Sequence, residues 1–268
     1  MSAITSRQHP IVKEFRELAQ SAGPSMLLDG WHLLTEAVAT GVAIDTVAWC
    51  GPPTAAEQIT LGRAQRGGAH VIEVSGSVLN ALSPVNTPTG VVASARKPHV
   101  DALAMVKPAP ALILAGVAIQ DPGNAGAVIR AAAAAGATGV VVDEATANPW
   151  GWKALRASMG ATFHLPVCRL RTIAPAVEGW RAAGVSIVAA VARGGTPMYD
   201  VDLTKSTALL LGGEGAGLPA SLVASADAQI SIPMEGSIES LNVAVAAALL
   251  LYEARRQRLA QGTQGHIF

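Results

Sequence analysis

The chain has 268 residues, of which 50% are apolar and 14% are charged. A chain of this length and composition can bury a sizeable core, with room for one large or two ordinary domains, and it is not largely disordered. The 19 basic and 19 acidic residues cancel, so a binding site for a polyanion has to be a local patch.

No membrane span, signal core or metal site is predicted. The longest uncharged apolar stretches, 111–119 and 241–252, are shorter than the roughly 20 residues of a membrane span. Residues 1–15 carry charges instead of an apolar signal core, and two cysteines are too few for a disulfide scaffold. The six histidines are scattered and the cysteines lack ligand spacing. We therefore expect a soluble protein of the cytoplasm that holds no metal.

Helical and extended patterns alternate through the first third of the chain. An apolar stripe over 6–19 predicts a helix. The elements expected after it are strand 26–28, helix 32–40, strand 44–49, helix 55–66, strand 70–74, helix 77–82 and strand 90–95. A stretch that contains several prolines then marks a linker over 98–110. The sequence thus predicts a small α/β domain over 1–97.

The rest of the chain, 111–268, repeats the alternation with more apolar strands. Strands are expected at 112–117, 139–143, 165–168, 186–191, 208–211 and 229–232, and helices at 124–135, 150–158, 173–183, 219–224 and 240–258. Near-continuous runs of Val, Ile, Leu and Ala in the strands are typical of a parallel sheet covered by helices on both faces. The fold class is therefore α/β, with a second and larger domain over 111–268.

Three polar loops that contain glycine follow strands of this second domain. The first opens a helix, with Asn124 as the expected cap and Arg130 one and a half turns later. The second, 211–219, has four glycines, and Glu214 is its single charge. In open α/β sheets ligands bind beyond the carboxyl ends of the strands, so such loops predict a binding site.

The third loop, 232–242, leads into the last helix. We expect Ser237 or Ser240 to cap that helix, with Asn242 in its first turn. Each of these features also has an ordinary structural explanation, because glycines serve turns and serines cap helices. The occurrence of all three loops in one domain favours the functional interpretation.

The best-known nucleotide motifs do not fit the glycines of the second loop. Gly213, Gly215 and Gly217 have the wrong spacing for Gly-x-Gly-x-x-Gly, and they lie near the end of the chain rather than after the first strand of the domain. No segment fits the P-loop pattern Gly-x-x-x-x-Gly-Lys-Ser/Thr. A nicotinamide-dependent oxidoreductase is therefore a distant alternative.

Taken together, the three loops resemble the signature motifs of SpoU (TrmH-type) RNA ribose 2′-O-methyltransferases, in the SPOUT superfamily. The matching segments are Asn124-x-Gly126-Ala127-Val128-x-Arg130, Gly212-Gly213-Glu214-Gly215-x-Gly217 and Ile232-Pro233-Met234-x-Gly236-x-x-x-Ser240-Leu241-Asn242-Val243. The intervening Arg156-x-Ser158-x-Gly160 is also similar to the family. The domain over 1–97 resembles the L30e-like RNA-binding domain that many members carry.

This resemblance implies a SPOUT domain with a deep trefoil knot, S-adenosylmethionine as cofactor, and a homodimer. By correspondence with the family, residues that contact the cofactor are Gly212, Gly213, Ile232 and Leu241. The residues implied in the catalytic region are Asn124, Arg130, Glu214, Ser240 and Asn242. Two positions depart from the usual pattern, since Gly213 replaces a residue that is often Ser or Asn and Ala244 replaces a frequent Ser.

The residue types suit methyl transfer to a ribose hydroxyl, which depends on positioning and charge stabilisation. Arg130, presented toward the partner subunit's cofactor, would orient the substrate and stabilise the developing alkoxide, because a guanidinium is a poor base. The asparagines would fix Arg130 or the ribose, and Ser240 would contact substrate or cofactor. Glu214 would anchor the loops or pair with Arg130.

The expected substrate is RNA, more specifically 23S ribosomal RNA because of the L30e-like first domain. A tRNA ribose methyltransferase and a catalytically silent RNA-binding factor of ribosome assembly are the alternatives. Phosphate contacts could come from Arg7, Lys13, Arg16 and the pair 96–97, although these could equally be ordinary solvated charges. Two tryptophans, Trp150 and Trp152, are candidates for base stacking or for core and dimer packing.

Overall fold

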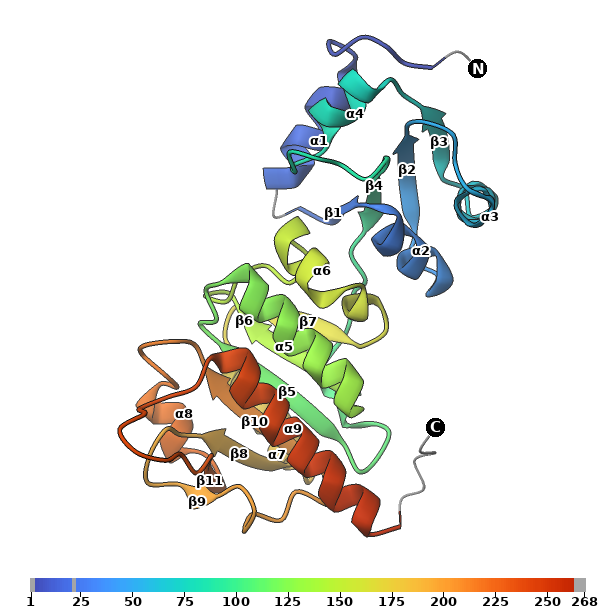
Figure 1. Cartoon of the computed structure of the whole chain (residues 1–268). Coiled ribbons are helices and arrows are strands. Elements are labelled where there is room, and N and C mark those ends of the chain that lie inside the picture. Colours follow the sequence, from blue (N-terminus) through green and yellow to red (C-terminus); the bar gives the residue numbers. More distant parts are fainter. Residues whose placement is uncertain (1–2, 21–22, 263–268) are drawn as a thin grey trace. The chain divides into compact units, whose positions relative to one another are not determined.

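The computed structural model describes residues 3–20 and 23–262, and it divides the chain into two compact units (Figure 1). The first unit consists of Met1–Pro98 and Trp150–His164, and the second consists of His99–Pro149 and Leu165–Phe268. Among the described residues, no helix is both long and apolar enough to span a membrane.

The first unit is built on a mixed sheet, which has four strands in its described part, in the order β1-β4-β2-β3. Strands β2 and β3 are parallel, and β4 runs antiparallel to β1 and β2. Its strands and long helices are α1 (Pro10–Gln20), β1 (Ser25–Asp29), α2 (Trp31–Ala39), β2 (Ile44–Trp49), α3 (Ala55–Arg66), β3 (His70–Glu73), α4 (Gly76–Leu82) and β4 (Val91–Arg96). The predicted alternation of helices and strands in this region is confirmed.

The core of the first unit lies between the sheet and helices α1 and α4. Phe15 of α1 and Leu82 of α4 are buried there against Leu27 of β1. Apolar residues at helical spacing in α1 thus cover one face of the strands, as the stripe over this segment predicts.

A segment from the second half of the sequence also packs on this unit. It comprises the helix α6 (Trp152–Ser158) and the 3-10 helix η2 (Ala161–Phe163). Trp152 packs against the core of the first unit, and His164 Nε2 lies 2.6 Å from Glu36 Oε2. The sequence places this segment in the second domain, because it lies between two strands of that domain along the chain.

In the second unit, the described residues form a parallel sheet of seven strands in the order β7-β6-β5-β10-β8-β11-β9. The strands are β5 (Leu112–Val117), β6 (Gly139–Asp143), β7 (Val167–Leu170), β8 (Ser186–Ala190), β9 (Thr196–Pro197), β10 (Thr207–Gly212) and β11 (Ala228–Ser231). The predicted parallel sheet is therefore confirmed. In the sheet, strand β10 lies between β5 and β8, although four strands, β6 to β9, come between β5 and β10 along the chain. The deep knot itself stays a prediction.

Helices cover both faces of this sheet (Figure 1). The helices of the second unit are η1 (Ala102–Val106), α5 (Pro122–Ala135), α7 (Ala174–Ala182), α8 (Ala220–Ala224) and α9 (Val243–Ala260). Helices α5 and α9 lie side by side on one face, while α7 and η1 pack on the other around the buried Trp180. Although 98–110 is predicted as a linker, Ala102 and Met105 of η1 are buried in this core.

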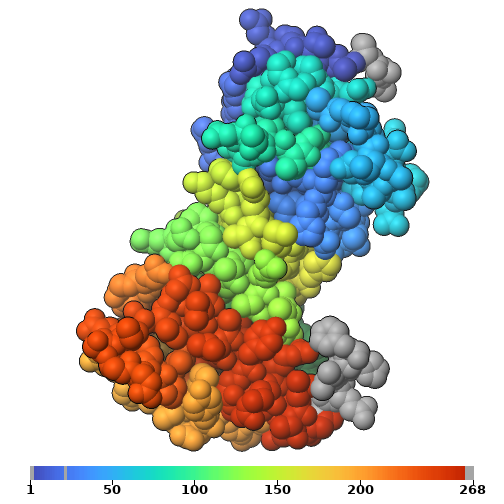
Figure 2. Space-filling view, viewed as in Figure 1, coloured from blue at the N-terminus to red at the C-terminus, as the bar shows by residue number. Residues whose placement is uncertain are grey.

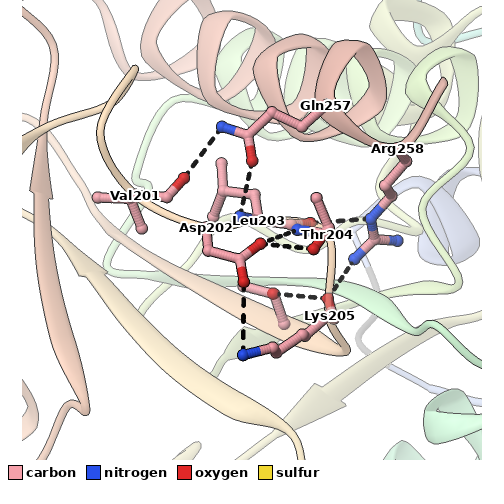
Figure 3. A network of polar contacts seen from close by, with 8 residues as sticks. Val201, Asp202, Leu203, Thr204, Lys205, Gln257 and Arg258 are labelled. Carbon is pink, nitrogen blue, oxygen red and sulfur yellow. Dashed lines mark hydrogen bonds and ion pairs between the residues drawn. The ribbon is translucent and has the colours of Figure 1, made fainter. Parts of the chain in front are cut away.

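The C-terminal end of α9 is fastened to the amino-terminal side of the sheet (Figure 3). Arg258 donates to the carbonyl oxygens of Leu203 at 3.0 Å and Lys205 at 2.7 Å, and also to those of Pro110 and Ala111 at 3.0 and 2.9 Å. Pro110 and Ala111 precede β5, and Lys205 precedes β10. One guanidinium therefore ties α9 to the starts of two central strands.

Candidate active site

A cavity of about 470 Å³ lies at the carboxyl ends of β8, β10 and β11, beside the first turns of α9. It is lined by 190–192, by residues of the loop after β10, and by residues of 230–243, with two further side chains from α9. The four residues predicted to contact the cofactor, Gly212, Gly213, Ile232 and Leu241, all line this cavity. Its volume falls within the range of small-molecule sites, about 300–1,000 Å³.

The charged side chains in the wall of the cavity are acidic. Glu214 and Glu239 line the cavity, and no lysine or arginine of the described chain does so. A wall of this kind favours a ligand with a positive centre, and within the described chain it offers no lysine or arginine to pair with a pyrophosphate. The pyrophosphate of a nicotinamide dinucleotide would therefore lack a cationic partner here.

Two glycines of the second loop are required by close backbone packing. A β-carbon on Gly213 would collide with the carbonyl oxygen of Ala118, and one on Gly212 would collide with the backbone of Gly217. The Gly213 amide donates to the Val117 carbonyl at 2.7 Å. In this chain a larger residue at 213 would therefore have to displace the loop that follows β5.

The three predicted loops meet through a network of side-chain amides and one carboxylate. Asn124 and Asn242 both donate from Nδ2 to Glu214 Oε1, at 2.9 and 3.0 Å. The Nδ2 atom of Asn242 also lies 3.0 Å from Asn124 Oδ1. Glu214 thus connects the start of α5, the loop after β10 and the start of α9.

Both helices that carry the asparagines are capped by residues other than those predicted. Asp121, not Asn124, caps α5, because its Oδ1 accepts from the Asn124 amide at 2.8 Å. Asn242 caps α9 by accepting from the amides of Ala244 and Val245 at 2.9 and 3.4 Å, so the expected cap at Ser237 or Ser240 is wrong. The Asn124 side chain is consequently free to reach Glu214.

The other two predicted catalytic residues lie outside this network. Ser240 is exposed and lines the cavity. Arg130 is exposed on α5, and it forms no hydrogen bond or ion pair with any other residue between 3 and 262 that the structure describes. Within one chain Glu214 therefore binds the two asparagines and not Arg130.

Residues Ala190, Val191 and Ala192 line the cavity but are absent from the sequence prediction. They have small or apolar side chains, so they contribute backbone groups and packing surface rather than a recognisable motif. Their position after β8, directly beside β10, is the signal that points to them, because ligands bind at the carboxyl ends of parallel strands.

The residues proposed for RNA contact are spread over the first unit. Arg7, Lys13 and Arg16 are exposed, and Lys13 Nζ lies 3.8 Å from Glu17 Oε1. The Trp152 ring is partly buried against the core, with Lys153 Nζ 5.4 Å from its centroid, whereas Trp150 is buried. No group of three or more potential metal ligands occurs in the described ranges.

Two families of known domains match the chain. Residues 111–252 match the SpoU rRNA methylase family, and residues 10–93 match the MRM3-like substrate binding domain. The chain belongs to the SpoU rRNA methylase family. The first match covers the whole cavity and the asparagine network, and the second runs from α1 to the first half of β4 in the first unit.

Proteins whose names state an activity or a bound ligand are similar to this chain over nearly its full length. The 23S rRNA (guanosine(2553)-2′-O)-methyltransferase RlmP of Bacillus subtilis is 31% identical, with 95% of this chain and 100% of the relative covered. The AdoMet-bound rRNA methyltransferase from Sinorhizobium meliloti is 31% identical with a TM-score of 0.86, covering 95% of this chain and 97% of its own. The SpoU methyltransferase AviRb from Streptomyces viridochromogenes, in complex with AdoMet, is 30% identical with a TM-score of 0.83, covering 93% and 98%.

Proposed function

We propose that this protein is an S-adenosylmethionine-dependent methyltransferase that methylates a ribose 2′-hydroxyl in 23S ribosomal RNA. The observation that carries the proposal is the convergence of the three motif loops on one acidic cavity. The reaction is supported by the similar RlmP and Sinorhizobium meliloti proteins, which are described as rRNA methyltransferases, and the cofactor is supported by the AdoMet-bound structures of the Sinorhizobium meliloti protein and of AviRb.

The residues of the cavity fit S-adenosylmethionine. Gly212 and Gly213 present backbone at the wall, Ile232 and Leu241 supply apolar surface, and the carboxylates of Glu214 and Glu239 suit a cation. When bound, this cofactor supplies an electrophilic methyl group on a positively charged sulfur. The protein's own task is then to hold the ribose hydroxyl in line with that group.

Asn124, Glu214 and Asn242 serve this task by fixing the loops that surround the reacting groups. Their mutual hydrogen bonds hold α5, the loop after β10 and α9 in one arrangement. Ser240, exposed at the cavity wall, is in place to contact the ribose or the cofactor. These residues orient the substrate, and none of them needs to act as a strong base.

Arg130 supplies the positive charge that stabilises the developing alkoxide and holds a neighbouring phosphate, in the site of the partner subunit. Its exposure and its lack of a partner within the described chain are compatible with a role across a dimer. The exposed Val245, Leu249 and Tyr252 on α9, which lies beside α5, form an apolar stripe at helical spacing. Figure 2 shows the red α9 and the orange-red segment before it exposed on one face of the second unit. A homodimer formed through this face would bury the stripe.

The first unit is proposed to bind the RNA substrate, supported by its match to the MRM3-like substrate binding domain. Ribosomal RNA is favoured over tRNA because RlmP and the Sinorhizobium meliloti protein, both similar to this chain over nearly its full length, are described as rRNA methyltransferases. An enzyme that modifies ribosomal RNA works where ribosomes are made, so we expect it in the cytoplasm.

Mapping of 2′-O-methyl marks tests the substrate. Ribosomal RNA and tRNA are compared from cells that lack the protein, from cells that carry it, and from cells that carry Arg130→Ala. We expect one ribose mark in 23S ribosomal RNA to require the unaltered protein. A mark that is lost from tRNA instead would move the assignment to tRNA, and unchanged marks in both RNAs would contradict the proposed function.

A further inference from the structure

The backbone turns sharply after β5 at Ala118, which has a φ of +54°. A left-handed conformation is unfavourable for a residue with a β-carbon, so it persists only where neighbouring groups hold it. The carboxylate of Asp143, the last residue of β6, provides this hold. Its Oδ1 accepts from the Ala118 amide at 2.9 Å.

The same carboxylate oxygen organises the loop after β6. It accepts from the amide of Thr146 at 2.9 Å and from the Thr146 hydroxyl at 2.6 Å. The Thr146 Oγ1 in turn accepts from the Ile119 amide at 3.1 Å, and Thr146 is only 1% exposed. Asp143 and Thr146 thus satisfy the two successive amides at the turn after β5.

This turn lies against Gly213 in the wall of the cofactor cavity. The Ala118 carbonyl is the group that a β-carbon on Gly213 would strike, and Gly213 lines the cavity. The next residue, Glu214, is the acceptor for Asn124 and Asn242. A movement of Ala118 would therefore be transmitted to the cavity wall and to the asparagine network.

We infer that Asp143 is a positioning residue for cofactor binding, acting through Ala118 and Gly213. The inference rests on the proposed function, since the ligand whose affinity it controls is S-adenosylmethionine. Asp143 itself lies outside the set of residues that line the cavity. Its effect is on the shape of the wall after β10, not on direct contact with the cofactor.

Calorimetric titration of the full chain with S-adenosylmethionine tests this role. Asp143→Ala removes the acceptor for Ala118, and we expect the Kd to rise at least about fivefold, because a part-buried amide loses its partner. Asp143→Asn keeps an oxygen at the same place and should bind within about twofold of the unaltered protein. If asparagine restores the affinity that alanine loses, the hydrogen bond to Ala118, and not the size of the side chain, is what matters for binding.

Arg169→Ala is the matched control. Arg169 donates to the carbonyl oxygens of Glu144 at 2.7 Å and Thr146 at 3.2 Å, so it supports the same loop without bonding to Ala118 or Ile119. Its loss should lower thermal stability and leave the Kd unchanged. An equal rise in Kd in Arg169→Ala and Asp143→Ala would overturn the inference, because general loosening of the loop would then explain both.

A double-mutant cycle with Gly213→Ala gives an independent result. In the unaltered background the added β-carbon strikes the held Ala118 carbonyl, so affinity falls. In the Asp143→Ala background that carbonyl can shift, and the penalty of Gly213→Ala should be smaller. Additive effects would overturn the coupling. If the unaltered protein does not bind S-adenosylmethionine, the proposed function fails; if it binds and Asp143→Ala binds equally well, only this inference fails.

Discussion

Glu214 shows how far a single residue can be assigned from sequence. Its position as the only charge in a glycine-rich loop predicts that it belongs to the site. The sequence leaves undecided whether it binds the neighbouring loops or pairs with Arg130. Which of these partners Glu214 contacts depends on how the chain folds, because Asn242 and Asn124 lie 28 and 90 residues away from it along the sequence. No local sequence pattern contains that information. In the structure both asparagines reach the carboxylate.

Replacing this carboxylate should damage activity more than stability. Glu214→Ala leaves the side-chain amides of Asn124 and Asn242 without their acceptor, and we expect kcat/KM to fall at least about tenfold. Glu214→Gln keeps one acceptor oxygen and should lose less. Methyl-transfer kinetics decide the matter, and an alanine variant with unaltered kcat/KM would contradict the role of the network.

A second residue-scale prediction concerns Asp29, whose side chain is buried at the end of β1 and accepts from Ser83 Oγ at 2.5 Å. Burial raises the pKa of this carboxyl above 3.8, although the Ser83 hydrogen bond and the charge of Arg156 oppose the shift. Relative to the unfolded state, the folded state therefore stabilises the neutral form of Asp29. The contribution of this protonation to the free energy of unfolding is fully present below pH 3.8, and it is lost as the pH rises through the pKa that Asp29 has in the folded protein.

Asp29→Asn should consequently be at least as stable as the unaltered protein at pH 7, because it removes the buried charge and keeps an acceptor for Ser83. The advantage should shrink as the pH falls toward 3.8. Denaturant unfolding at several pH values measures this difference. A variant that loses stability at pH 7 and regains it in acid would show that the charged form is the stabilised one.

At the scale of elements, buried strands are the most predictable parts of the chain. Strands β5 and β6 occur at the predicted bounds because their continuous apolar runs have no competing interpretation. The start of α9 is less predictable, since Ser237, Ser240 and Asn242 are all good caps. Only the tertiary position of the preceding loop selects Asn242.

Helix α9 borders the cavity at its start. At its other end, Arg258 and the backbone carbonyls that it contacts form the Arg258 cluster, part of which Figure 3 shows. Burial lowers the pKa of Arg258, and its guanidinium donates to four backbone carbonyls. Arg258→Met should therefore cost about 2 kcal/mol of unfolding free energy, since the carbonyls lose a charged donor.

Arg255→Met provides the control on the same helix. Arg255 has one long hydrogen bond, at 3.5 Å to the Ala135 carbonyl, so its replacement should cost less than about 0.5 kcal/mol. Thermal and urea unfolding of both variants measure the difference. Equal losses would indicate that the Arg258 cluster adds nothing beyond general packing of the helix end.

At the scale of the whole molecule, the sequence predicts two α/β parts but not the membership of Trp150–His164. The apolar residues of this segment indicate that it packs against a hydrophobic core, but they do not indicate which of the two cores. Its position along the chain, between two strands of the second unit, suggests the second unit, whereas it belongs to the first. Its contacts with β1 and with Glu36 place it on the first unit. Residues that follow one strand of a sheet need not pack on that sheet.

A mixed-subunit experiment tests whether Arg130 acts in the partner's site. Arg130→Ala and Glu214→Ala should each be strongly impaired alone, but in the proposed dimer a mixed pair of subunits has one site with both residues intact. Random pairing should restore about a quarter of the unaltered activity, because half of the dimers are mixed and each has one working site. No recovery, although mixed dimers form, would place Arg130 in its own subunit's site or outside catalysis.

In the proposed reaction, the acidic cavity and the three loops around it hold the cofactor and the ribose so that a methyl group passes to the 2′-hydroxyl. The most direct measurement incubates the purified protein with labelled S-adenosylmethionine and 23S ribosomal RNA, then digests the RNA and identifies the labelled nucleoside by mass spectrometry. We predict a 2′-O-methylnucleoside that is absent with Arg130→Ala. A label on a base, or the same 2′-O-methylnucleoside at an unchanged rate with Arg130→Ala, would contradict the account.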